Sequence, residues 1–161
     1  MSQSLRPNSD IDTASWLRTG GGSYYTQVNE STPNDATFIT SVPLTSGTIK
    51  FGLTNPSGTP PVLTGHIIHA RCINAVAGAV QINDTTNGVV ASFTPTLLAT
   101  DDTYELEEAE AAQISDYNTL ELWIDSPAVG TASVSQTYFE VPSAQSIIPI
   151  IMHQRKMQGL S

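Results

Sequence analysis

Apolar and polar residues alternate with a period of two along most of the chain from residue 48 onwards. This period is typical of strands that bury one face, because successive side chains of a strand point to opposite sides. In the first such segment Ile49, Phe51 and Leu53 share one face. The alternation predicts strands over Thr48–Asn55, His66–Asn74, Ala79–Asn83, Val89–Phe93, Thr103–Leu106, Thr119–Asp125 and Thr131–Val141.

The segments between these strands carry turn signals and little helical pattern. Asn87-Gly88 supplies the positive φ angles that a tight hairpin loop needs. One helical patch, residues 107–114, is about two turns long. Turn signals recur at intervals of roughly 8 to 12 residues, as in an all-β sandwich. The sequence therefore predicts an all-β fold, a jelly-roll-like antiparallel β-sandwich with a short helix and extended N- and C-terminal arms.

The length of 161 residues corresponds to one ordinary domain, but the two ends differ in composition from the middle. Residues 1–35 are rich in Asn, Ser, Thr and Gly, and we expect this segment to pack on the sandwich or on a neighbouring molecule. Residues 36–141 make up the predicted β-sandwich. Residues 142–161 hold an apolar run and two cations, and we expect them to form an arm with a reach of about 60 Å when extended.

Composition supports strands and excludes several classes of partner. Ser and Thr account for 37 of the 161 residues, and charged residues for 13%. Thr fits a pleated sheet, and both residues are mediocre helix formers. The formal net charge is −9, and Lys and Arg are missing between Arg71 and Arg155. Because phosphate recognition requires a basic surface, we expect neither nucleic acid nor an anionic membrane as a partner.

The first residues and the single cysteine bear on the cellular compartment. The sequence MSQSLRPNSD lacks the apolar core of a signal peptide, so we expect synthesis in the cytoplasm without export by that route. Cys72 alternates with Ile68 and Ala70, which predicts a core position in which the residue acts as a small apolar side chain. A single cysteine forms no disulfide within the chain.

Histidines and carboxylates are the candidates for chemistry. His66 and His69 are three residues apart on a predicted strand and therefore point to opposite faces, where we expect them to meet solvent or a neighbour rather than share a metal ion. Residues 101–125 hold nine of the fifteen carboxylates. We interpret this stretch as a solvated acidic edge. A glycosidase would need two of these carboxylates at a defined separation, which sequence does not fix.

Two further alternatives concern ligands. A calcium site built from Asp10 and Asp12, or from Asp101 and Asp102, stays open because calcium selects oxygen ligands, although the spacing matches no calcium-loop template. Trp123 lies off the apolar face of its strand, which leaves three interpretations: a stacking platform for a glycan, an interface residue, or part of the core of a second layer. We expect no catalytic residues, no metal and no cofactor.

Two blocks of the sequence resemble a pattern found in many structural proteins of tailed-phage particles. The first block, residues 5–41, contains an Arg-Pro pair, a Trp, a Gly-rich turn and the segment NESTPNDA at 29–36. The second combines TGH at 64–66 with ISDYNTLELWI at 114–124. The likeness extends from residue 5 to residue 141 and leaves out the C-terminal segment.

The resemblance implies a jelly-roll module of a virion, of the kind used in decoration or cement proteins, head fibres and tail appendages. We predict a capsid decoration protein on the outer capsid surface that binds the major capsid protein, stabilises the shell and forms a homo-oligomer, with a trimer favoured. The alternative is a tail-fibre or head-fibre protein, or a free carbohydrate-binding module, that recognises a host glycan through Trp123. The residues predicted to contact the shell lie in the two terminal segments: Leu5, Arg6, Ile147, Ile148, Ile150, Ile151, Arg155 and Lys156.

Overall fold

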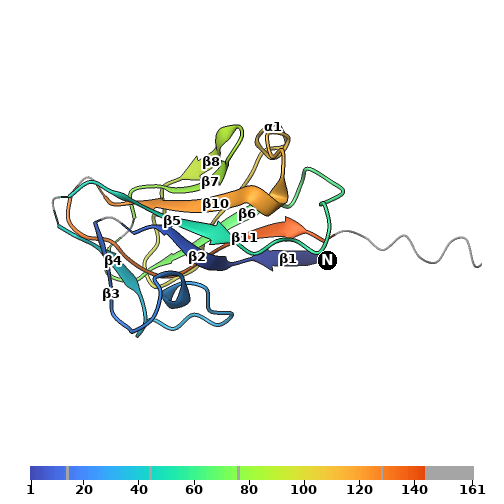
Figure 1. The fold of residues 1–161 in the computed structure, drawn as a ribbon. Coiled ribbons are helices and arrows are strands. Elements are labelled where there is room, and N and C mark those ends of the chain that lie inside the picture. The colour runs from blue at the N-terminus through green and yellow to red at the C-terminus, as the bar shows by residue number, and fades with distance from the viewer. Residues whose placement is uncertain (14, 44, 76, 128, 144–161) are drawn as a thin grey trace, which may run out of the picture.

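Two antiparallel β-sheets pack face to face in the computed structural model, which describes residues 1–13, 15–43, 45–75, 77–127 and 129–143 (Figure 1). Sheet A has the strand order β3–β4–β11–β6–β9, with β1 also pairing with β11. Its strands are β1 (Ser2–Leu5), β3 (Trp16–Arg18), β4 (Ile39–Ser41), β6 (Ile67–Cys72), β9 (Asp102–Glu105) and β11 (Ser133–Pro142). Sheet B has the order β2–β5–β10–β7–β8. Its strands are β2 (Pro7–Asp12), β5 (Thr48–Leu53), β7 (Val80–Asp84), β8 (Gly88–Phe93) and β10 (Leu120–Asp125).

Helical structure in the described residues is limited to single turns: α1 (Glu108–Ala111) and the 3-10 turns η1 (Tyr25–Gln27) and η2 (Tyr117–Thr119). The sequence predicted about two helical turns over 107–114, so the helix is shorter than expected. After α1 the chain is drawn towards the β7–β8 hairpin, because the amide of Ser115 donates to Asp84 at 2.6 Å. The fold is the jelly-roll-like antiparallel β-sandwich that the alternation predicts.

The space between the sheets is filled by the apolar faces of the predicted strands. Both β5 and β10 bury every second residue, and Phe51 and Leu122 are fully covered. Sheet A contributes Ile68 and Phe139 to the same core. Cys72 is also fully buried, which confirms its predicted core position, and burial raises the pKa of its thiol. Removal of this apolar surface from water is the main driving force for the association of the sheets.

β11 is the central strand of sheet A. Along one edge it pairs with β6, and along the other edge it pairs first with β4 and then with β1. Between β4 and β1 the edge is completed by a loop, because the amide of Thr137 donates to the Val28 carbonyl at 3.0 Å. The first five residues of β11 are buried without alternation, as expected for a strand whose outer side is also covered.

The cover on that outer side comes from residues 29–36, the NESTPNDA segment. Ser135 donates to Asp35 at 2.7 Å, and the side-chain amide of Gln136 donates to the Glu30 carbonyl at 2.6 Å. Arg71 of β6 donates two hydrogen bonds to Asp35, at 2.8 and 2.6 Å. These bonds from Arg71, together with the one from Ser135, lower the pKa of Asp35 to about 2. The segment is therefore fixed against sheet A by polar contacts.

The N-terminal segment is not an extended arm in this structure. β1 joins sheet A and β2 joins sheet B, so the chain crosses between the sheets at Arg6. The crossing is held by two hydrogen bonds with Thr54: the Arg6 amide donates to the Thr54 hydroxyl and the Thr54 amide donates to the Arg6 carbonyl, each at 2.9 Å. The alternation did not reveal these strands, because β2 buries only its first residue, Pro7, and β1 buries only its last, Leu5.

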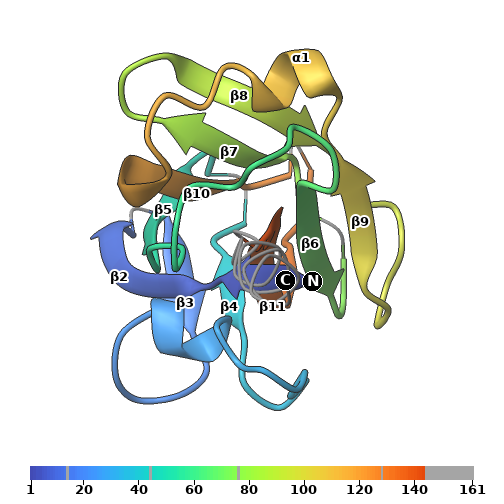
Figure 2. The same ribbon diagram turned by 90° about the vertical axis from the view of Figure 1, so that its right-hand side faces the viewer.

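The two ends of the described chain meet at one pole of the sandwich. The amide of Ser143 donates to the carbonyl of Met1 at 3.1 Å, directly after the pairing of Ser2 with Pro142. Figure 2, which looks onto this pole, shows the N-terminus beside the end of β11. The predicted C-terminal arm began at residue 142, but Pro142 still belongs to β11; the rest of that arm, residues 144–161, lies outside the described residues.

Substitution of Gly78 tests the close contact between the β6–β7 loop and the end of β10. A Cβ atom at this position would lie 2.5 Å from the carbonyl oxygen of Ser126, a backbone atom that cannot rotate away. Gly78→Ala should therefore lower the free energy of unfolding by about 1–3 kcal/mol, as overpacking does. Urea unfolding followed by tryptophan fluorescence measures the change. The matched control is Gly21→Ala, because a Cβ there meets nothing within 4 Å; equal effects of the two substitutions would contradict the interpretation.

Candidate functional site

His66 lies in the interior, one residue before β6 begins. Its Nδ1 is 3.1 Å from the Leu63 carbonyl oxygen, which can only accept, so Nδ1 carries the proton and Nε2 accepts from the Tyr117 hydroxyl at 2.7 Å. Burial lowers the pKa of His66 and raises the pKa of Tyr117, so both side chains are neutral near pH 7. Of the two alternatives, solvent or a neighbour, His66 meets neighbours, because its ring is packed against Tyr117 and Phe139.

His69 lies on the outer side of sheet A. Its Nδ1 is 2.8 Å from Asp101 Oδ2 and its Nε2 is 3.2 Å from Glu140 Oε2. The ring stacks on Tyr138 with centroids 4.1 Å apart. The two histidines thus lie on opposite sides of sheet A, as the strand spacing predicts: His66 packs against Phe139 of the core and His69 against Tyr138. In the part of the chain that the structure describes, no three His, Cys, Asp or Glu side chains are grouped to hold a metal ion.

Several carboxylates accept hydrogen bonds from the backbone amides of loops. Asp84 is fully buried and accepts hydrogen bonds from Ser115, from the amide of Thr86 and from the amide of Asn87. Burial opposes its charge, yet these hydrogen bonds outweigh the burial and lower the pKa of Asp84 to about 2. Asp84 therefore ties the β7–β8 hairpin to the segment that follows α1.

The aspartates of the calcium alternative are engaged in a similar way. Asp10 accepts from the amides of Tyr24 and Tyr25, at 2.9 and 2.7 Å. Asp102 accepts from the amides of the loop before β9, which lowers its pKa although burial acts in the opposite direction. Asp101 pairs with His69, and Asp12 is the last residue of β2. Oxygen atoms of Asp10, Asp101 and Asp102 are thus bonded to protein groups.

The predicted contact residues for a partner fall into two groups. Leu5 is only 1% exposed and belongs to the core of this chain. Arg6 lies over the ring of Tyr138, 4.5 Å from its centroid, and donates to the carbonyl of Glu30. The others lie outside the described residues: Ile147, Ile148, Ile150, Ile151, Arg155 and Lys156.

Trp123 is half-buried on the outer face of sheet B. Its cross-strand neighbours are Lys50 on β5 and Gln81 on β7. The Lys50 ammonium lies 4.4 Å from the centre of the indole, and the indole N–H donates to Glu121 Oε2 at 2.7 Å. These contacts fix the orientation of the ring. The prediction that it forms a glycan platform stays a prediction.

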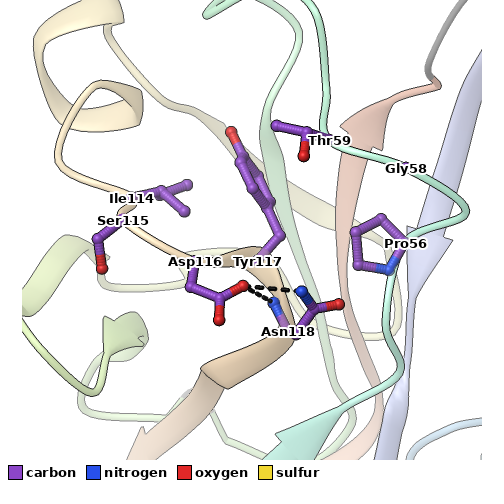
Figure 3. Close-up of a pocket in the computed structure, with 8 residues that line it drawn as sticks. All are labelled: Pro56, Gly58, Thr59, Ile114, Ser115, Asp116, Tyr117 and Asn118. Carbon is purple, nitrogen blue, oxygen red and sulfur yellow. Dashed lines mark hydrogen bonds between the residues drawn. The ribbon is translucent and has the colours of Figure 1, made fainter.

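Two depressions are formed beside the segment that leads into β10. The first, of about 230 Å³, is lined by residues that include Pro56, Thr59, Ile114, Asp116, Tyr117 and Asn118 (Figure 3). The second, of about 390 Å³, is lined by residues that include Asn8, Ser9, Gly52, Asn55, Asn118 and Glu121. Asn118 belongs to both. We call the two together the Asn118 groove.

Sequence reasoning did not find this groove. Its walls come from β2, from β5 and the loop after it, from Thr85 in the β7–β8 hairpin, and from the segment that leads into β10, which are distant in sequence and carry no shared spacing. One signal is present in the sequence, because Asp116, Tyr117 and Asn118 are consecutive polar and aromatic residues directly before the predicted strand Thr119–Asp125.

Fold and groove together define an all-β sandwich with a polar depression at one side. No protein-family model matches the sequence, and no curated protein matches it. Among solved structures, the chain is similar to CBM29_1, a family 29 carbohydrate-binding module from Piromyces equi, with 13% identity, a TM-score of 0.42, and coverage of 96% of this chain and 97% of that chain. In the described residues no helix is long and apolar enough to cross a membrane. The fold assignment here rests on the strand pairing of the chain itself.

The depressed pKa of Asp84 predicts a pH-dependent loss of stability. The pKa is about 2 in the folded protein against an ordinary value of 3.8, so the ionised carboxylate stabilises the fold above pH 4 and this contribution disappears as the pH falls towards 2. Asp84→Asn should lower the free energy of unfolding by about 2 kcal/mol at pH 7, and the difference from wild type should shrink between pH 4 and 2. Urea unfolding at a series of pH values measures both.

The matched control for Asp84 is Glu105→Gln, since Glu105 is an exposed carboxyl of β9. It should change stability little at any pH. A loss for Asp84→Asn that is the same at pH 7 and at pH 2 would mean that the carboxylate charge does not support the hairpin.

Proposed function

We propose that the protein is a structural component of a virus particle, of the type that decorates the outside of the capsid and stabilises the shell by binding the major capsid protein. The observation that carries the proposal is the meeting of Met1 and Ser143 at one pole. The remaining residues, 144–161, are joined to the sandwich at that pole. A segment attached there can contact a shell from one end of the sandwich.

The use of the reactive side chains inside the fold also supports a structural function. His66 and Cys72 are fully buried, and Asp84 and Asp102 bind loop amides. His69 is held between two carboxylates. A catalytic nucleophile or base must instead reach a substrate.

We propose that the C-terminal segment makes the contacts with the shell. Its apolar residues at 147–151 supply contact area, and Arg155 and Lys156 supply positive charge on an otherwise acidic protein with a net charge of −9. Charge complementarity of this kind favours acidic patches on a partner. A trimer on a three-fold position follows as the favoured assembly, because closed symmetry lets each copy use the same contact.

Deletion of residues 144–161 tests the attachment. The sandwich should remain folded, because strand β11 and its bond to Met1 are kept, while occupancy of purified capsids should fall at least about tenfold, a loss of about 1.4 kcal/mol. Quantitative mass spectrometry of the particles, with thermal unfolding of the free protein, measures both. The full chain should be present at about one copy per capsid subunit, as shared symmetry requires.

The charge variant Arg155→Ala with Lys156→Ala separates charge from apolar contact in the same assay. It should weaken attachment less than the deletion and more strongly at low salt. Unfolding of the truncated protein would place the apolar run in the core and contradict the arm. A few copies per particle would favour the fibre, tail or carbohydrate-binding alternative, and absence from particles would overturn a virion function.

A further inference from the structure

We propose that the Asn118 groove binds a neutral carbohydrate chain. This inference does not depend on attachment to a capsid, since the groove is built entirely from residues of the sandwich. Its two depressions share Asn118; Tyr117 lines the first, and Glu121 of β10 lines the second. The proposal rests on the rigidity of these walls, on the polar atoms that they leave available and on their charge.

The aromatic wall is fixed from behind. The Tyr117 hydroxyl is 2.7 Å from Nε2 of the fully buried His66, so the phenol cannot rotate freely. Figure 3 shows the ring standing beside the pocket, between Thr59 and Ile114. Sugar rings present C–H groups on one face and stack on such aromatic side chains. A ring held in place in advance loses little conformational entropy when a ligand stacks on it.

The polar atoms at the centre of the groove are oriented by internal bonds. Asp116 Oδ1 accepts from both the backbone amide and the side-chain amide of Asn118, at 2.9 and 2.8 Å. This arrangement orients Asp116 Oδ2 and Asn118 Oδ1, which have no other partner among the described residues. Glu121 is held in the same manner, because its Oε2 accepts from the Trp123 indole and its Oε1 stays available. Acceptors and amide donors at fixed positions are suited to the vicinal hydroxyl groups of a sugar.

Close approach of β2 to β5 forms the floor of the larger depression. Gly52 lies there, and a Cβ atom at this position would collide with the Ser9 hydroxyl. The absence of a side chain at Gly52 lets the Ser9 side chain lie close against β5. The side-chain amides of Asn8 and Asn55 border it and add further polar groups.

The charge of the groove selects against anions. Its described lining contains Asp116 and Glu121 and no Lys, Arg or His. Lys50 lies beyond it, over Trp123. A phosphate, a sulfate or an acidic sugar would therefore meet carboxylates without a compensating cation. A neutral oligosaccharide fits these groups, since its hydroxyls can donate to the carboxylates.

Titration of the ¹⁵N-labelled full chain with neutral hexasaccharides tests the proposal. The probes are cellohexaose, mannohexaose and chitohexaose, with inorganic phosphate and spermidine as charged comparisons. At least one hexasaccharide should shift the amide signals of residues 115–121 and 52–59 in a saturable way. Asn118→Ala should weaken that binding about tenfold, because it removes the side chain shared by both depressions.

The control for Asn118 is Asn74→Ala, an exposed asparagine outside the groove, which should leave the affinity unchanged. Tyr117→Phe keeps the ring and removes the bond to His66; it should weaken binding without loss of the folded spectrum. Asn118→Ala should still occupy capsids as the wild type does, so failure of this inference is distinguishable from failure of the capsid proposal. The inference is overturned if no hexasaccharide shifts the groove amides, if spermidine alone shifts them, or if the shifts are confined to Trp123 and Gln81.

Discussion

The backbone pairing of β11 is the interaction on which the rest of the structure depends. This strand holds β6 along one edge, and β4, the Val28 loop and β1 along the other. The segments that pair with β11 in turn position other parts of the structure. β1 leads into β2 at the edge of sheet B, β6 presents His69 to the outside, and the NESTPNDA segment is fixed over the outer side of β11. Burial of the inner face, with Phe139 and Val141 in the core, gives this ladder its stability.

Loops are held mainly by carboxylates that accept hydrogen bonds from backbone amides. Asp10, Asp84, Asp102 and Asp116 all act in this way, each on a different loop or turn. Such a device needs no cation, which fits a chain with only six Lys and Arg. In the acidic stretch 101–125, which we interpreted as a solvated edge, Asp102 and Asp116 therefore hold loops in place. Charge-assisted bonds to amides are stronger than neutral ones and orient the loop that they cap.

The sequence was informative where one face of a strand is buried. Alternation located β5 and β10, and Asn87-Gly88 located the hairpin, whose Gly88 has a φ of 86°. It was uninformative where strands bury a single residue, as in β1 and β2, or where a side chain's surroundings come from remote segments, as for His66. The Asn118 groove belongs to the second kind, because four separate parts of the chain form its walls. Periodicity records burial within one strand and carries no information about which loops meet.

The pairing of β1 with β11 has a consequence for the order of folding. Its partners, Ser2 with Pro142 and Leu5 with Phe139, stand at opposite ends of the described chain, so closing this ladder carries a large loop-closure entropy and a high contact order. During synthesis the first strand must wait until β11 has been made. Sheet B has no such requirement between β7 and β8, which are joined by a short hairpin and can pair early. Closure of β1 onto β11 is thus a late step, and until then the unpaired β1 is a strand that the nascent chain must protect from the wrong partner.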